Sequence, residues 1–365
     1  MALSLDWLPQ TPHNLLAVGF YEGVVGLWDL TTASALLRVR EPDRSLSLLP
    51  HRCFLAQDHA VRALAFCPAS RHLLATAGGD RHVKVWDLRR RCDPVAVQKR
   101  FLTNEICWPL TAPGLLICQE CAFVAKGSHG LHFISLSSPS YFAIPRNTTV
   151  WSITYSEWLN VAVSADVVGE LILSILPQLD SSGPLVKRNI LRRFPICFTS
   201  MVPLEGQKET AEGEEEGGVE QQQEKEEVSK EQNGSPDGGK ENQEVQKENA
   251  LLLHFQTYKE GVQKYGLHYA DSNVKNLKNF ENRPPWKQMK NTENSTTVNF
   301  EDSTMTALHK VRFSPNMSSQ VWLASAGQAG LVRLHCLRFL MGPDAEKMIR
   351  QRRQHFTERL EESSP

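Results

Sequence analysis

The chain has 365 residues, 41% of them hydrophobic, which is enough to form a sizeable buried core. Its formal net charge of −1 conceals an asymmetry: residues 205–249 carry 15 acidic residues and five lysines, so the remaining 320 residues have a net charge of +9. Eight scattered cysteines argue against a disulfide-stapled secreted domain, and charges within the most apolar stretch, 150–176, argue against a membrane span.

The first 90 residues contain one pattern twice. The segment LLAVGFYEGVVGLWDL (15–30) aligns without a gap with LLATAGGDRHVKVWDL (73–88). A short apolar run that ends at a proline precedes each of them, LSLDWLP (3–9) and VRALAFCP (61–68). Period-2 alternation between Gly and Asp turns predicts short antiparallel strands, and the self-similarity indicates a unit of about 40 residues.

Weaker copies of the unit follow along the chain. They span residues 106–136, 149–176 and 310–337. The run PICFTSMVPL (195–204) predicts the opening strand of a sixth unit, whose second half would be ALLLHFQTY (250–258). Small antiparallel sheets of this kind bury their faces only against one another, and radial stacking achieves this in a β-propeller. We therefore predict an all-β propeller with six visible units, which leaves room for a seventh.

One unit carries a recognisable set of side chains. It has Asp58-His59 before its first strand and Trp86-Asp87 at the end of its third, and it resembles the WD40 family. In that family a His, a Ser or Thr, an Asp and a Trp form a hydrogen-bonded tetrad. The resemblance implies a WD40-type propeller and a structural tetrad, whose members here are His59, Thr76, Asp80 and Trp86.

The other units depart from this pattern. Val18 stands in place of the hydroxyl residue in the first unit, and His335 stands in place of the Trp in the last.

The predicted organisation of the chain has four parts. They are residues 1–204 with propeller units one to five and the opening strand of a sixth, 205–249 as an insertion, 250–340 with the remaining strands and a Tyr/Lys-rich inserted loop, and 341–365 as a C-terminal helical tail.

The acidic run 205–249 has no aromatic residue and almost no large apolar one. Ordering it would cost backbone entropy that no burial offsets, so we predict a disordered acidic insertion. It is either a solvated spacer or a docking segment for a basic partner. In the tail, Met348, Ile349, Phe356 and Leu360 are spaced to form one apolar stripe along a short helix.

Motifs of catalysis are absent from the sequence. It has no Gly-rich phosphate loop, no nucleophile elbow and no His-Glu-x-x-His motif. Cys118 and Cys121, followed by His129 and His132, come nearest to a metal motif. Their seven-residue gap is shorter than the loop of a zinc finger, so ordinary strand cysteines are favoured. We predict a protein that is not an enzyme and that uses no metal or other cofactor.

Three consecutive arginines, Arg89, Arg90 and Arg91, follow the third strand of the best-preserved unit. A strand end of this kind lies at the face or rim of a propeller, where charged residues form a solvated turn. Guanidinium groups displayed together could instead contact DNA phosphates or an acidic partner. Both interpretations remain open, and these arginines are the candidate partner or DNA-backbone contact.

A more specific resemblance rests on two stretches, 3–30 and the Tyr/Lys-rich YKEGVQKYGLHYADSNVKNLKNFENRPPWKQMK with its continuation to residue 316. Together they resemble the WD40-bearing beta subunits of general transcription factor IIIC, and the likeness runs over essentially the whole chain. The resemblance implies an N-terminally shortened form of a nuclear scaffold subunit. It would help promoter recognition at tRNA-type genes and recruitment of RNA polymerase III by protein–protein contacts.

The same resemblance implies the partners. They are the other factor IIIC subunits, especially the large DNA-binding alpha subunit, with DNA contacted mainly through the complex. Neither a membrane nor a small-molecule substrate is expected. A second hypothesis is a WD40 reader of basic peptides such as histone tails, motivated by the acidic run and by the central channel of a propeller.

Overall fold

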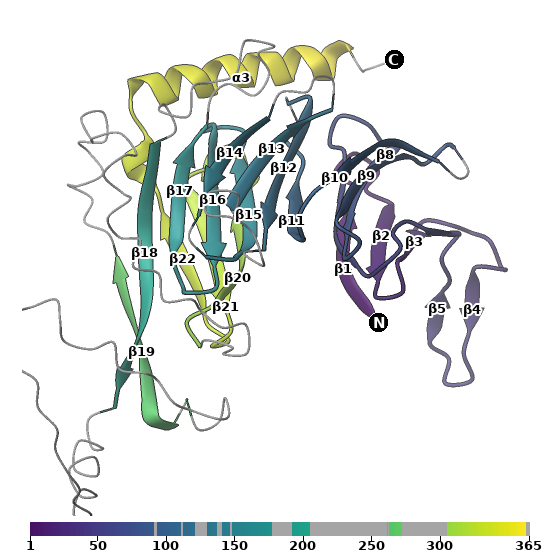
Figure 1. Ribbon diagram of the computed structural model, residues 1–365. Helices are drawn as coiled ribbons and strands as arrows, with labels where there is room; N and C mark the ends of the chain where they lie inside the picture. The colour runs from purple at the N-terminus through teal and green to yellow at the C-terminus, as the bar shows by residue number, and fades with distance from the viewer. Residues whose placement is uncertain are drawn as a thin grey trace, which may run out of the picture. The chain divides into compact units, whose positions relative to one another are not determined.

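The computed structural model describes residues 1–90, 93–110, 112–120, 130–136, 141–146, 148–176, 192–204, 261, 263–271 and 305–362. They fall into two units: Met1–Ser200 with Leu267–Pro365, and Met201–Gly266. In the second unit, the Leu204 N–H donates a hydrogen bond of 3.0 Å to the Lys264 carbonyl. The first unit contains most of the strands and the long C-terminal helix (Figure 1).

The first two sheets have four antiparallel strands each. The first has the order β1-β2-β3-β6, formed by β1 (Ala2–Trp7), β2 (Leu15–Phe20), β3 (Val24–Asp29) and β6 (Arg52–Leu55). Between its third and fourth strands lies a separate hairpin of β4 (Arg38–Arg40) and β5 (Leu46–Leu48). The second sheet is formed in chain order by β7 (Val61–Phe66), β8 (Leu73–Gly78), β9 (His82–Asp87) and β10 (Pro94–Lys99).

The next three sheets keep the order of the chain. The third consists of β11 (Thr103–Cys107), β12 (Gly114–Gln119), β13 (Gly130–Ser135) and β14 (Tyr141–Pro145). The fourth consists of β15 (Val150–Ser156), β16 (Val161–Asp166), β17 (Leu171–Ile175), β18 (Arg192–Pro203) and β19 (Tyr265–Asp271). The last has three strands, β20 (Leu308–Phe313), β21 (Trp322–Gly327) and β22 (Val332–Cys336).

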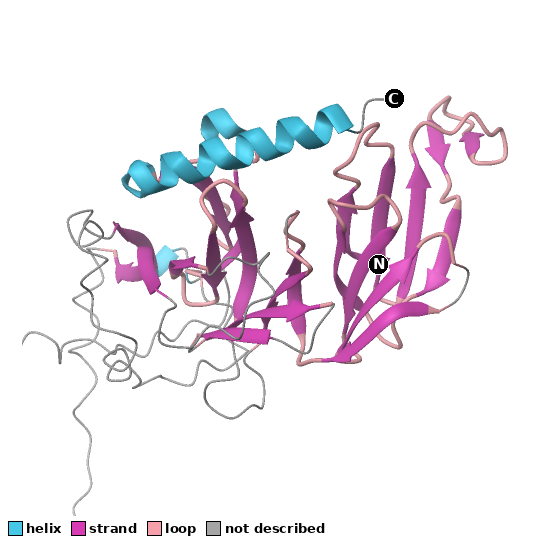
Figure 2. Ribbon diagram, turned by 90° about the horizontal axis from the view of Figure 1, so that it is seen from above, coloured by secondary structure: helices cyan, strands magenta, loops and turns pink. Residues whose placement is uncertain are grey.

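A short 3-10 turn, η4 (Met317–Ser319), lies between β20 and β21, a second, η5 (Arg338–Leu340), follows β22, and helix α3 (Pro343–Glu362) comes next (Figure 2). Ile349 of α3 is buried in the apolar cluster between the fourth and last sheets, and Met348 is half-buried, as the predicted stripe requires. The side chains of Phe356 and Leu360 lie outside the described residues. No helix in the described part of the chain is long and apolar enough to cross a membrane.

The predicted all-β architecture is confirmed, but one strand has a different place. Residues 195–204 were expected to open a sixth unit; most of them lie in β18, which pairs with β17 and so extends the fourth sheet, with Cys197 opposite Leu171. This run ends near Pro203, and the opening strands of the first two units also end just before a proline, Pro9 or Pro68. This likeness explains why the run was assigned to an opening strand. Residues 250–258 and the acidic insertion 205–249 lie outside the described residues, so the unit count of six stays a prediction.

Apolar clusters join each sheet to the next. In the first, Val25 and Leu27 of the first sheet pack against Leu64 and Phe66 of the second. Three further clusters repeat this arrangement between the second and third, third and fourth, and fourth and last sheets. In every cluster the third strand of one sheet meets the opening strand of the next, so the core is a series of sheet-to-sheet interfaces.

A tight turn fixes the entry to the second sheet. Gly23, between β2 and β3, has a φ of +84°, and a Cβ there would lie 2.2 Å from the Gln57 carbonyl oxygen. Only glycine adopts this conformation without strain and permits so close a backbone approach. The Ala56 and Gln57 N–H groups both donate to the Gly23 carbonyl, which holds the segment that leads into β7.

Candidate interaction sites

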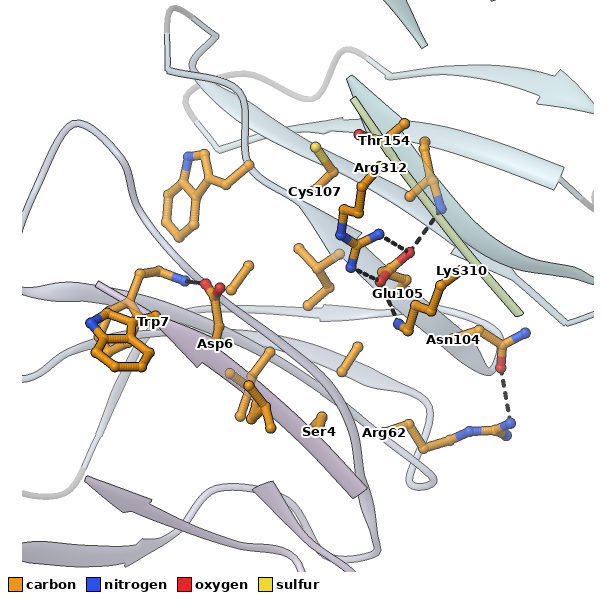
Figure 3. A pocket seen from close by; sticks show the side chains of 18 of the residues that line it. Ser4, Asp6, Trp7, Arg62, Asn104, Glu105, Cys107, Thr154, Lys310 and Arg312 are labelled. Carbon is orange, nitrogen blue, oxygen red and sulfur yellow. Dashed lines mark hydrogen bonds and ion pairs between the residues drawn. The ribbon is translucent and has the colours of Figure 1, made fainter. Parts of the chain in front are cut away.

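The opening strands β1, β7, β11, β15 and β20 line a cavity of about 640 Å³ (Figure 3). The strand registers place one residue of each opening strand at an equivalent position facing this space, and these residues are Asp6, Ala65, Cys107, Thr154 and Arg312. Two residues earlier, the same alternation places Ser4, Ala63, Glu105 and Lys310 on the wall. Opening strands line the central channel of a propeller, so we call this cavity the channel.

Glu105 is the centre of the polar contacts in this channel. Its carboxylate accepts hydrogen bonds from Lys310 Nζ at 2.6 Å and Arg312 Nη2 at 2.5 Å, both from the last sheet. From the fourth sheet, the Ser152 hydroxyl donates at 2.5 Å and the Ile153 N–H at 2.8 Å. One buried carboxylate therefore ties the third sheet to the fourth and the last (Figure 3).

The two channel carboxyls titrate differently. Burial raises the pKa of Glu105, but Arg312 and Lys310 more than offset this, so its pKa lies below the ordinary value. Burial also raises the pKa of Asp6, and there the hydrogen bond of 2.7 Å from the Phe66 N–H offsets the effect only in part. Glu105 is thus held as an anion, and Asp6 binds a proton more readily than an exposed aspartate.

The remaining polar groups of the channel are paired in the same way. Arg62 forms an ion pair with Glu120 at 2.6 Å and donates to the Asn104 side-chain oxygen at 2.9 Å. Burial raises the pKa of the Cys107 thiol to about 12, so this thiol stays neutral and is a poor nucleophile. The described channel wall consequently offers paired charges and apolar surface, a chemistry suited to packing against a partner.

The structure brings together part of the predicted tetrad. Trp86 Nε1 donates to the Thr76 hydroxyl at 2.9 Å, and the second donor to that hydroxyl is Gln57 Nε2 at 2.8 Å. The predicted member His59 is exposed. Gln57 is fully buried and takes the position in the tetrad that was expected for His59. Asp80 accepts from two turn N–H groups, those of Asp58 and His82, at 3.0 and 3.1 Å.

Sequence reasoning missed Gln57 because the loop before β7 has no periodicity that fixes which side chain points inward. A polar residue two positions before the expected histidine was the available signal. The fully buried amide needs partners, and Thr76 supplies one of them.

The arginine run begins with a self-contained ion pair. Arg89 Nη2 lies 2.8 Å from Asp87 Oδ2, and its Nε donates to Asp87 Oδ1 at 3.0 Å. Hydrogen bonds from Arg89 hold the pKa of Asp87 well below its usual range. Arg90 is largely exposed, with its Nε 3.9 Å from Asp87. Arg91 lies outside the described residues.

The motif that comes nearest to a metal site is described only in part. Cys118 and His132 lie on neighbouring strands, whereas Cys121 and His129 are not among the residues described.

One family model matches part of this chain, and solved chains are similar to parts of it. The family model "WD domain, G-beta repeat" matches residues 50–87, the segment that contains Gln57, Thr76 and Trp86. Two solved chains are similar at 16% identity with a TM-score of 0.37. One, from the crystal structure of a mitotic checkpoint complex, is aligned over 45% of this chain and 46% of its own; the other, the WD40 repeats of RRP9, over 49% and 47%.

Two curated relatives match the whole chain. General transcription factor 3C polypeptide 2 of Pongo abelii is 38% identical over 366 residues, and that of Homo sapiens is 37% identical; each alignment covers 100% of this chain and 37% of the relative. The chain thus spans just over a third of the length of these relatives. Over its entire length the chain is similar to part of general transcription factor 3C polypeptide 2, and within it residues 50–87 match the WD domain, G-beta repeat.

Proposed function

We propose that this chain acts as a non-catalytic scaffold subunit of the general transcription factor IIIC complex in the nucleus. The observation that carries the proposal is the 37–38% identity to general transcription factor 3C polypeptide 2 over the full chain. Its partners are then the other subunits of the factor, especially the large DNA-binding alpha subunit. Through protein–protein contacts it would help promoter recognition at tRNA-type genes and recruit RNA polymerase III, with DNA reached mainly through the complex.

The channel chemistry supports a scaffold more than an enzyme. Acid–base catalysis needs a group that exchanges protons near neutral pH, and nucleophilic catalysis needs an activated nucleophile. Glu105 is held ionised by two cations, and burial keeps Cys107 protonated. Neither Glu105 nor Cys107 is therefore in a form active in such catalysis.

Arg89, Arg90 and Arg91 are the proposed contact for an acidic partner or for the DNA backbone. Arg89 is turned toward Asp87, which fixes its position but also neutralises part of its charge. Both arginine side chains are largely exposed, but Arg90 lies farther from the same carboxylate. The contact would therefore depend more on Arg90 than on Arg89.

Affinity capture from nuclear extract tests the proposal. The tagged full chain should recover other factor IIIC subunits, identified by mass spectrometry. Replacing Arg89, Arg90 and Arg91 by serine should reduce that recovery, because it removes three positive charges from one turn. A matched control replaces the exposed Arg38 and Arg40 of β4 by serine and should leave recovery unchanged. Capture of no factor IIIC subunit by the folded protein would overturn the proposal.

The alternative, a reader of basic peptides, has less support from the channel. A basic peptide entering it would compete with Lys310 and Arg312 for Glu105. Titration with histone-tail peptides separates the two hypotheses. Micromolar binding that Glu105→Gln abolishes would favour the reader, and no binding would leave the scaffold as the proposed function.

A further inference from the structure

Three departures from the repeat meet at one place in the first unit. The last sheet has His335 where the best-preserved unit has Trp86, the fourth sheet continues into β18, and β19 adds a fifth strand to it. These elements supply Cys197 from β18, Asp271 from β19 and His335 from β22. The thiol sulfur, a carboxylate oxygen and a ring nitrogen all lie within 4.8 Å of one another. Three side chains that can ligate a metal are thus brought together from two sheets.

Two of these three side chains are buried. Cys197 is 1% exposed and lies in the apolar cluster that joins the fourth sheet to the last, and His335 is 7% exposed. The side chain of Asp271 is 64% exposed at the end of β19. Val332 and Leu334, which alternate with His335 along β22, lie on the opposite, open face of the last sheet. The group is therefore buried at its thiol and imidazole and reaches water at its carboxylate.

Two of the three side chains also have the outer contacts that metal ligands need. The Ser325 hydroxyl lies 2.9 Å from His335 Nε2, a contact that leaves Nδ1 for a metal. Arg333 Nη2 donates to the two Asp271 carboxylate oxygens at 3.1 and 3.2 Å, and the guanidinium lies over the ring of Tyr269. Ligating imidazoles and carboxylates generally have such partners, which fix their orientation. The two ligands are therefore oriented before a metal binds.

The donor atoms determine the kind of metal. A sulfur, an imidazole nitrogen and a carboxylate oxygen together suit Zn²⁺, whereas Mg²⁺ and Ca²⁺ prefer oxygen ligands alone. The bond lengths of tetrahedral zinc place its ligand atoms about 3.3–3.8 Å apart, so small side-chain movements would close this group around the ion. Asp271 can ligate through one oxygen while the other keeps its contact with Arg333. The thiolate and carboxylate charges then balance the charge of the zinc ion.

We propose that Cys197, Asp271 and His335 bind one zinc ion, which links the fourth sheet to the last and has water as its fourth ligand. On binding, the Cys197 thiol releases its proton to water and the sulfur coordinates the metal. The sequence-based expectation was a protein without a metal, because the ligands come from strands that the repeat pattern does not place together. The inference does not depend on the proposed role in transcription.

Zinc titration of the full chain tests the proposal. The chain would be freed of metal with a chelator and titrated with Zn²⁺ alone by calorimetry. We expect a Kd of about 1 µM or tighter and a Tm that rises as the site fills. With Co²⁺ in place of Zn²⁺, a thiolate-to-metal charge-transfer band should appear together with the d–d bands of tetrahedral cobalt. The charge-transfer band reports the sulfur ligand independently of stability.

Substitution of each ligand should weaken binding. Asp271→Ala, Cys197→Ala and His335→Gln should each raise the Kd about hundredfold or more, and Cys197→Ala should also abolish the charge-transfer band. Asp271 is largely exposed, so its variant remains informative where a buried substitution impairs folding, which circular dichroism checks. Ser325→Ala removes only an outer contact and should raise the Kd about tenfold.

Two further cysteines provide matched controls. Cys336 follows His335 on β22 but is exposed on the open face, so Cys336→Ser should leave the Kd unchanged. Cys121→Ser removes a ligand of the other candidate metal motif in the sequence and should also leave the Kd unchanged.

Three results would overturn the proposal. If the folded, metal-free chain binds no zinc, Cys197 and His335 are packing residues and Asp271 forms only a surface ion pair. If binding is undiminished in both Asp271→Ala and Cys197→Ala, the ion lies elsewhere. If Cys121→Ser abolishes binding, the zinc belongs to the other motif. None of these outcomes bears on the capture of factor IIIC subunits, so the two proposals can fail separately.

Discussion

The second and last sheets are built from the same repeat but differ in how they are held. In the second, Trp86 and Gln57 donate to the Thr76 hydroxyl, and both faces are covered by neighbouring sheets. In the last, Ser325 and His335 occupy the positions of Thr76 and Trp86 and keep a hydrogen bond of 2.9 Å. That sheet has three strands and one open face.

This difference shows that the polar signature and the apolar interfaces are separate sources of stability. The last sheet has lost the tryptophan, yet Leu323 and Val311 remain buried against the fourth sheet. Lys310 and Arg312 also tie the last sheet to Glu105 of the third, as Arg62 ties the second sheet to Glu120. Substitutions can weigh these contributions against each other.

The largest effect is expected at Glu105, because the last sheet depends on it. Glu105→Ala would leave the Ser152 hydroxyl and the Ile153 N–H buried without their acceptor and would remove the partner of Arg312. We expect a loss of about 3 kcal/mol in the free energy of unfolding, measured in urea. Hydrogen exchange should quicken in β20 more than in β8. Equal effects in both strands would contradict a special role in holding the last sheet.

Thr76→Val is expected to cost about 2 kcal/mol, because two buried donors, those of Trp86 and Gln57, lose one acceptor. The corresponding change in the last sheet, Ser325→Ala, removes a single hydrogen bond to His335 and should cost about 1 kcal/mol. Thermal unfolding of both variants gives the comparison. Equal losses would mean that the last sheet relies on its polar pair as much as the second does.

Val83 and Val332 occupy equivalent positions, so replacing each by alanine compares a side chain that a neighbouring sheet covers with one that is exposed. Val83→Ala in β9 should cost about 1.5 kcal/mol, because two buried methyl groups are lost at about 0.8 kcal/mol each. Val332→Ala in β22 should change stability by less than about 0.5 kcal/mol, since its side chain is exposed. Urea titrations of both variants test this. A large loss at Val332 in the isolated chain would show that its face is covered.

The smallest effect concerns pH. Burial lowers the pKa of His335, and the nearby Arg333 lowers it further, so the folded protein binds a proton there less readily than the unfolded chain. In the metal-free chain, stability should therefore be complete above the ordinary histidine pKa and fall as the pH drops below it. His335→Gln should flatten the part of this decline between about pH 7 and pH 5. An unchanged slope in the variant would exclude His335 as its source.

The sequence predicted what depends on local pattern. Alternating residues and Gly and Asp turns gave the strands, and the fixed register of one hairpin brings Thr76 and Trp86 together. It did not predict Gln57, which lies in an aperiodic loop. Nor did it predict the contact between Glu105 and Arg312, because 207 residues separate them and only the assembled sheets bring them close.

The open face of the last sheet was equally invisible in the sequence. Val332 and Leu334 alternate in β22 as Val83 and Val85 do in β9, so their pattern is that of a covered strand. Alternation reports which residues are suited to burial. Whether a neighbouring sheet buries them is decided by the rest of the assembly.

Two uncovered apolar sheets also have a consequence for the life of the molecule in a cell. Chaperones and proteases recognise exposed apolar strands and unpaired strand edges, which are features of incompletely folded chains. A chain that displays Leu5, Val332 and Leu334 would be retained or degraded until they are covered. Covering these side chains would therefore lengthen the lifetime of the protein as well as stabilise its fold.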